Sequence, residues 1–167
     1  MRWTYCDRWN GLLEEPIDPI GEAEARRRHD TGELYTAVSE ESDKKRVLVE
    51  VRLENDYASV RFLDDLGRNE NVLTFRKLDD RLFLRKVISY DYGESEERGG
   101  YARPIVIESF TYKPDETMRH KIDDIRNKDI TVEDYRAINV DVHWEPIPAF
   151  GDYASIARWD RDVAADA

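Results

Sequence analysis

The sequence predicts an α+β fold in which a meandering antiparallel β-sheet, open or closed into a barrel, carries about three flanking helices. Two runs of alternating apolar and charged residues, 48–54 and 57–63, are separated by a turn and have the pattern of a β-hairpin. The same period of two returns through most of the middle of the chain. Candidate strands at hairpin-like intervals therefore favour an antiparallel meander.

A single domain is expected, because 167 residues, 40% of them hydrophobic and 38% charged, are enough for one core. The apolar residues recur periodically, and no Pro- or Ser-rich tract divides them. The predicted parts are an N-terminal segment and helix docked on the sheet (1–32), a mainly antiparallel sheet with a helical insertion near 115–137 (33–145), and a C-terminal helix with a frayed tail (146–167).

The N-terminal segment 1–17 is rich in tryptophan and leucine, too much apolar surface for a free tail, so we expect it to dock on the core. A helix is predicted to follow. Asp18 can cap its first turn, and Pro19 has the fixed φ that suits the first helical position. The helix should end after His29, where Gly32 can adopt a left-handed conformation.

The first hairpin is expected to turn at Asn55-Asp56, with one apolar face. A two-residue turn at this position predicts the cross-strand pairs Val49–Phe62, Glu50–Arg61, Val51–Val60 and Leu53–Ala58.

A second hairpin is predicted from strands 71–78 and 81–90, with its turn at Asp79-Asp80. That turn predicts the cross-strand pairs Val72–Val87, Thr74–Arg85, Phe75–Leu84 and Arg76–Phe83.

The remaining elements are predicted from the spacing of apolar residues and from the positions of helix-breaking residues. The acidic loop 91–103 is expected to be either a lid or a connector. Spacings of four and three between Met118, Ile122 and Ile125 predict an amphipathic helix. Further strands are expected over 34–38, 104–112 and 138–145, and helices over 19–29, 116–127, 131–137 and 152–162.

The formal net charge of -11 and the pI of about 4.8 disfavour general nucleic-acid binding and binding to anionic membranes. Cys6 is the single cysteine, so no intrachain disulfide can form and a reducing compartment fits best. The N-terminus lacks the pattern of a signal peptide, and a cytoplasmic protein is expected.

Common nucleotide and hydrolase motifs are missing from the sequence, including glycine-rich phosphate loops and the G-x-S-x-G and H-E-x-x-H patterns. No cofactor or metal is therefore predicted.

One candidate catalytic group is formed by Asp141, His143 and Glu145, which alternate along the predicted strand 138–145. Such residues project from one face about 7 Å apart, so two of them could share a water or a metal ion. The same alternation is typical of an ordinary half-exposed strand.

A candidate ligand-binding group lies in the second hairpin and consists of Thr74, Arg76, Phe83 and Arg85. Cationic side chains on a sheet surface can hold an anionic ligand. Packing of arginine on an aromatic ring at an ordinary surface gives the same pattern.

The leading functional hypothesis is a non-enzymatic protein that binds a small molecule or a partner, with an acidic surface that binds or inhibits a basic protein. One alternative is a small hydrolase or isomerase that uses carboxylates and a histidine in the sheet concavity. Another is a structural subunit of an assembly, with exposed N-terminal tryptophans at its contacts. The oligomeric state is left open.

Overall fold

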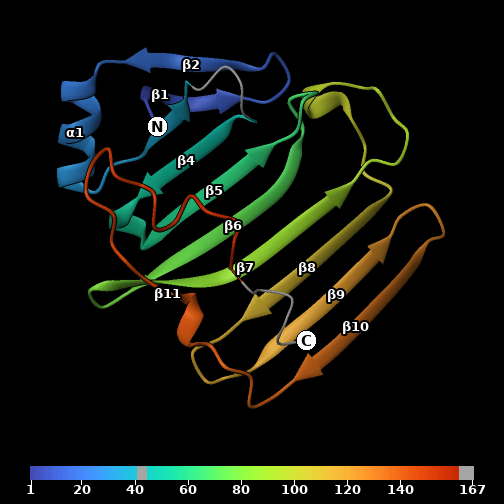
Figure 1. The fold of residues 1–167 in the computed structure, drawn as a ribbon. Coiled ribbons are helices and arrows are strands. Elements are labelled where there is room, and N and C mark those ends of the chain that lie inside the picture. Colours follow the sequence, from blue (N-terminus) through green and yellow to red (C-terminus); the bar gives the residue numbers. More distant parts are fainter. Residues whose placement is uncertain (41–44, 162–167) are drawn as a thin grey trace.

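The computed structural model describes residues 1–40 and 45–161, in which every strand belongs to one antiparallel sheet (Figure 1). The strand order is β10-β9-β8-β7-β6-β5-β4-β3-β1-β2, and β11 pairs with the start of β7. The strands are β1 Trp3–Asn10, β2 Glu15–Ile20, β3 Tyr35–Ser39, β4 Val47–Arg52, β5 Tyr57–Leu63, β6 Asn69–Leu78, β7 Arg81–Asp91, β8 Val106–Tyr112, β9 Met118–Asp124, β10 Asp129–Tyr135 and β11 Trp144–Pro146.

The fold is mostly β, and the predicted meander is confirmed. Its sheet is not closed into a barrel, because β2 and β10 lie at opposite ends of the strand order (Figure 1). The described residues form a single α-helix, α1 Glu22–Thr31, and three short 3-10 turns, Leu53–Asn55, Gly99–Tyr101 and Asp141–His143. None of the helical turns in this part of the chain is long and apolar enough to cross a bilayer.

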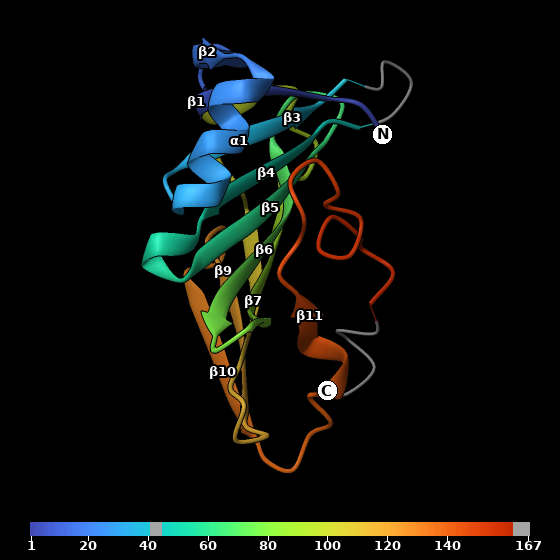
Figure 2. The same cartoon turned by 90° about the vertical axis from the view of Figure 1, so that its left-hand side faces the viewer.

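The two faces of the sheet differ in what lies on them. The C-terminal segment after β11 runs along one face only (Figure 2). We name this the covered face, and its apolar residues form the main core: Tyr35, Val49, Val60, Leu73, Phe75, Val87 and Phe110. We name the other side the open face, and a continuous row of directly paired residues crosses it: Glu50, Ser59, Thr74, Lys86, Thr111, Arg119 and Asp134.

The N-terminal segment docks as predicted, but as two strands. The predicted helix start at Asp18-Pro19 is wrong, because both residues lie in β2, and α1 begins after the N-cap residue Gly21. The predicted end is confirmed. Gly32 has φ 80°, and its N–H donates to the carbonyl of His29.

The first hairpin is confirmed as β4 and β5, but its predicted register is wrong by two residues. Val49 pairs with Val60 and Val51 with Ala58. The connection is longer than a two-residue turn, because Leu53–Asn55 forms a 3-10 turn and Asp56 takes φ 55°. A shift of two preserves the face of every side chain, so the apolar face is still buried.

The second hairpin is confirmed as β6 and β7, and the pairs Phe75–Leu84 and Arg76–Phe83 are observed. Beyond them a register shift makes the two other predicted pairs wrong. Thr74 pairs with Lys86, because Arg85 is an extra residue on β7.

The predicted helices over 116–127 and 131–137 are wrong, since this region forms the β9–β10 hairpin. Met118 and Ile122 are four residues apart, which suits one face of a helix but also one face of a strand. In β9 both are paired to β8, and Met118 is buried.

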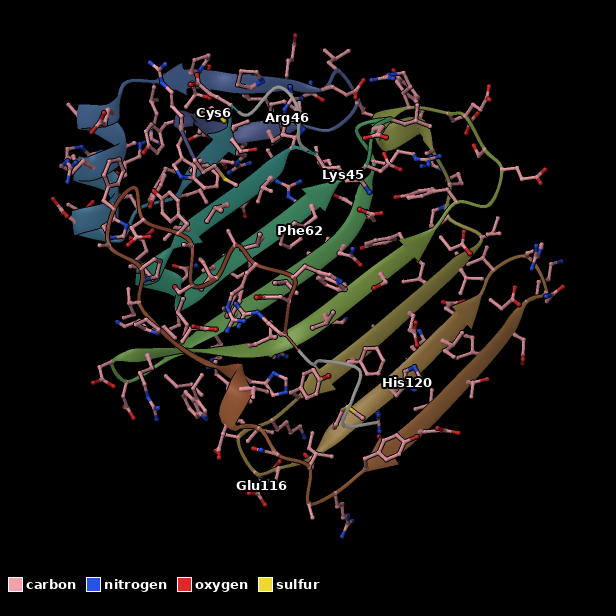
Figure 3. The ribbon with its side chains drawn as sticks, in the orientation of Figure 1. Cys6, Lys45, Arg46, Phe62, Glu116 and His120 are labelled. Atoms are coloured by element: carbon pink, nitrogen blue, oxygen red, sulfur yellow. The ribbon has the colours of Figure 1, made fainter. Side chains whose placement is uncertain are left out.

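The C-terminal region also differs from the prediction. Strand 138–145 is replaced by a 3-10 turn and the short β11, and residues 152–161 form turns instead of a helix. The last residue of that predicted helix, Asp162, lies outside the described residues. Tyr153 and Ile156 are buried on the covered face, and Trp159 contacts Phe62 of β5 (Figure 3).

Candidate partner-binding edge

The candidate catalytic residues Asp141, His143 and Glu145 do not share one exposed face. Asp141 is exposed, whereas His143 is fully buried, with its ring centroid 4.0 Å from that of Tyr112. Glu145 is buried on β11. The structure thus does not bring these three side chains together in the arrangement that the hydrolase or isomerase alternative needs.

Glu145 instead anchors the C-terminal segment. Its Oε1 accepts hydrogen bonds from Arg158, at 2.9 Å, and from Arg161. The Arg161 guanidinium also donates to the carbonyl of Ser155 and lies over the ring of Phe75. Burial lowers the pKa of Arg161. These contacts indicate a structural role for Glu145.

The candidate ligand-binding residues of the second hairpin are divided by burial. Thr74 and Arg76 lie on the open face, Phe83 is buried beside Trp144, and Arg85 is exposed at the register shift. Phe83 therefore contributes to the core. Of the four residues, Thr74 is half-buried and the two arginines are exposed.

The N-terminal tryptophans are not the exposed contacts that a structural subunit would need. Trp9 is 9% exposed, and half-buried Trp3 packs edge-on against Tyr153. Cys6 is fully buried, and burial raises the pKa of its thiol to about 11, so the thiol is a packing group at neutral pH.

A crevice of about 470 Å³ lies where Lys45, Glu14 and Arg98 approach one another (Figure 3 labels Lys45). Its cations have partners: Lys45 pairs with Glu70 at 2.8 Å, and Arg98 pairs with Glu14 at 3.1 Å. The guanidinium of Arg46 lies over the Trp9 ring. These pairs neutralise much of the charge of the crevice.

The β9–β10 hairpin presents a bare sheet edge. The structure pairs β10 with β9 on one side, and no described strand pairs with its other side. Six of its seven residues are exposed, including Ile130 at 59% and Val132 at 47%. The N–H and C=O groups on the outer side of β10 are therefore available to a further strand.

The opposite edge is closed to strand addition. β2 contains Pro16 and Pro19, which have no N–H to donate, and Asp18 has φ 47°, which interrupts the extended backbone. β10 has neither of these features, because it contains no proline and no residue with positive φ. The two edges of the sheet thus differ in their capacity to bind a strand.

Side-chain contacts hold the β9–β10 hairpin in shape. Arg119 makes a bidentate pair with Asp134, at 2.8 and 3.0 Å. His120 is hydrogen-bonded to Glu108 at 2.7 Å and stacks on Phe110 with ring centroids 4.4 Å apart (Figure 3). The edge strand β10 is therefore fastened to β9 on its inner side, and β9 is fastened to β8.

The two sides of β10 have different chemistry. Asp129 and Glu133 point to the covered face, while Ile130 and Val132 point to the open face, as their partners on β9 show. β10 itself contains no lysine or arginine. A strand added here would meet the carboxylates of the covered face on one side. On the open face it would meet the aliphatic groups and Asp134, which Arg119 already holds.

In comparisons with known proteins, no family model, no curated protein and no solved structure matches this chain. Within residues 1–40 and 45–161, no group of three or more His, Cys, Asp or Glu side chains could hold a metal ion.

Strand β10 was not predicted, because a helix was expected over 131–137. The signal was the alternation of Ile130 and Val132 with polar residues, in a segment with three β-branched residues in a row.

Proposed function

We propose that this protein is a non-enzymatic binding protein, and that it binds a basic partner protein by adding one of the partner's strands to β10. The observation that carries the proposal is the bare, exposed edge of β10 on a sheet whose other edge is closed. An exposed edge strand of seven residues can pair with a strand of another protein. Proteins that do not use such an edge for binding usually block it.

Backbone hydrogen bonds would supply the general affinity, and side chains would select the partner. The pattern that fits is an alternating strand, with lysine or arginine opposite Asp129 and Glu133 and aliphatic residues opposite Ile130 and Val132. Each favourable cross-strand pair contributes about 0.2 to 1 kcal/mol.

Charge favours a basic partner over a second copy of this chain. Two copies of β10 would bring only carboxylates and neutral side chains together, and each copy has a net charge of -11. Repulsion between the copies would weaken that dimer, whereas the same charge attracts a basic protein and speeds its association.

A synthetic peptide of alternating valine and lysine tests the choice of partner, with an alternating valine and glutamate peptide as its control. We expect the lysine peptide to bind at least about tenfold more tightly at low salt, and more weakly as salt is raised. Isothermal titration calorimetry measures both affinities. Equal affinity for the two peptides, or dimerisation of the protein in place of binding, would refute the proposal.

Proline substitutions test the mode of binding. Successive N–H groups of a strand point to opposite sides, so Thr131→Pro and Val132→Pro remove one N–H bonded to β9 and one free N–H. Loss of the N–H bonded to β9 should lower the thermal stability, whereas loss of the free N–H should not. We expect the variant that keeps its thermal stability to lose its affinity for the lysine peptide. Thr131→Val and Val132→Thr keep both N–H groups and serve as controls. Retained binding in both proline variants would contradict strand addition.

A further inference from the structure

The connection between β1 and β2 begins with the only Asn-Gly pair in the sequence, Asn10-Gly11. Asn10 is the last residue of β1, and its Oδ1 accepts hydrogen bonds from the backbone N–H groups of Leu12, at 3.0 Å, and Leu13, at 3.2 Å. We propose that Asn10-Gly11 is a site of self-modification, at which Asn10 loses its side-chain amide and becomes isoaspartate or aspartate. This site is independent of the β10 edge.

The reaction is an attack of the Gly11 nitrogen on Cγ of Asn10, and both groups belong to one chain, so no binding step is needed. A bond forms between these two atoms, and the bond from Cγ to Nδ2 breaks. The proton that leaves the Gly11 nitrogen is balanced by the proton that Nδ2 takes up as it departs as ammonia. Water then opens the cyclic imide. Opening at the backbone carbonyl gives isoaspartate, and opening at Cγ gives aspartate.

The hydrogen bonds to Oδ1 of Asn10 stabilise the charge that develops in this attack. Oδ1 becomes an oxyanion in the tetrahedral intermediate, and two backbone N–H groups already donate to it. Because both partners are donors, the accepting atom is the oxygen of the amide. The Asn10 side chain makes no other hydrogen bond within residues 1–40 and 45–161, so Nδ2 can leave as ammonia.

Gly11 has the freedom that the attack requires. It carries no side chain, a Cβ placed there would meet no atom within 4 Å, and glycine adopts most backbone conformations at little cost. Asn10 and Glu15 form the last pair of the β1–β2 ladder, and Leu12 and Leu13 beyond it are 52% and 62% exposed. This end of the hairpin can therefore open locally without unfolding the sheet.

The two products should affect the neighbouring backbone differently. The carbonyl of Gly11 accepts a hydrogen bond from the N–H of Gly100 at 2.8 Å, and a Cβ on Gly99 would lie 2.5 Å from the same oxygen. Isoaspartate adds one carbon to the backbone just before Gly11 and would displace this carbonyl. Aspartate leaves the backbone unchanged, and its carboxylate accepts the two N–H bonds more strongly. The isoaspartate form should therefore melt at a lower temperature than the aspartate form.

Peptide mass spectrometry after incubation at mildly alkaline pH tests the site, with Asn139 as internal control. Oδ1 of Asn139 also accepts a hydrogen bond, from the N–H of Asp141 at 2.9 Å, but the branched side chain of Val140 obstructs the attack. The incubation lasts until Asn10 has reacted in the guanidinium-unfolded chain. In the folded protein we expect Asn10 to gain the mass difference between an amide and a carboxyl group, while Asn139 stays unchanged. An unchanged Asn10, or equal conversion of Asn139, would refute the proposal.

Gly11→Ala is the matched variant for the reaction. Its Cβ fits without a clash, so its thermal stability should be unchanged or slightly higher. Conversion of Asn10 should slow at least about tenfold, because the methyl group hinders the approach of the nitrogen. Asn10→Asp reproduces the aspartate product and should melt above the purified isoaspartate form. Equal rates in Gly11→Ala and the wild type would overturn the mechanism, and equal melting of the isoaspartate form and Asn10→Asp would overturn its effect on the contact with Gly100.

Discussion

Glu145 and Arg161 lie almost entirely out of water at the junction between β11 and the C-terminal segment. Their side chains are 8% and 1% exposed, and Glu145 is also within hydrogen-bond distance of Arg158. Burial of a charge is costly unless a partner and further hydrogen bonds compensate it. Here Glu145, which lies in β11, is the partner of Arg161, and the carbonyl of Ser155 accepts a further hydrogen bond from Arg161. The pair therefore fastens the segment to the sheet.

Replacing Glu145 by glutamine should destabilise the protein, because the guanidinium of Arg161 stays buried without a countercharge. The expected loss in the free energy of unfolding is about 3 kcal/mol, measured by urea denaturation. Asp160→Asn is the control, because Asp160 is exposed and its pair with Arg158 should contribute less than about 1 kcal/mol. A similar stability for both variants would mean that the buried pair does not hold the segment.

Helix α1 shows how one element is stabilised by surface charge. It buries only Ala25, and each of its three arginines pairs with Glu22 or Glu24. Glu24 accepts hydrogen bonds from Arg27 and Arg28, which lower the pKa of its carboxyl to about 2. Glu22 makes a single, longer contact with Arg26, at 3.3 Å.

The contribution of Glu24 should depend on pH in a definite direction. Because the pKa of Glu24 is lower in the folded protein than its ordinary value of 4.5, its stabilisation is present above about pH 5 and is lost as the pH falls towards 2. Thermal melts of the wild type and Glu24→Gln should therefore differ at pH 6 and converge near pH 2. Glu22→Gln is the matched control, with a smaller difference at pH 6. A constant difference across this range would contradict the role of the carboxylate.

Some elements were predictable from the sequence because their signals are local. The turn at Asp79-Asp80 and the stop at Gly32 depend on a few adjacent residues, and both were confirmed. The register shift at Arg85 and the conversion of 116–137 from helix to hairpin were not predictable, because pairing with β6 and β8 decides them. The edge strand β10 was missed for the same reason, since a strand becomes an edge only through the order of the whole sheet.

At the scale of the whole molecule, the two faces of the sheet differ from each other, and so do its two edges. The C-terminal segment covers one face and leaves the other face open (Figure 2). Prolines close the edge at β2, while β10 is bare and acidic. Under the proposed function, this arrangement and the net charge of -11 would direct a basic, strand-forming partner to one edge of the molecule.

Hydrogen exchange of the backbone amides, with and without the alternating valine and lysine peptide, tests this central claim most directly. In the free protein, the amides on the outer side of β10 should exchange rapidly. With the peptide bound, alternate residues of β10 should become protected while those of β2 stay unchanged. Protection that appears elsewhere on the sheet and leaves β10 unchanged would contradict the account.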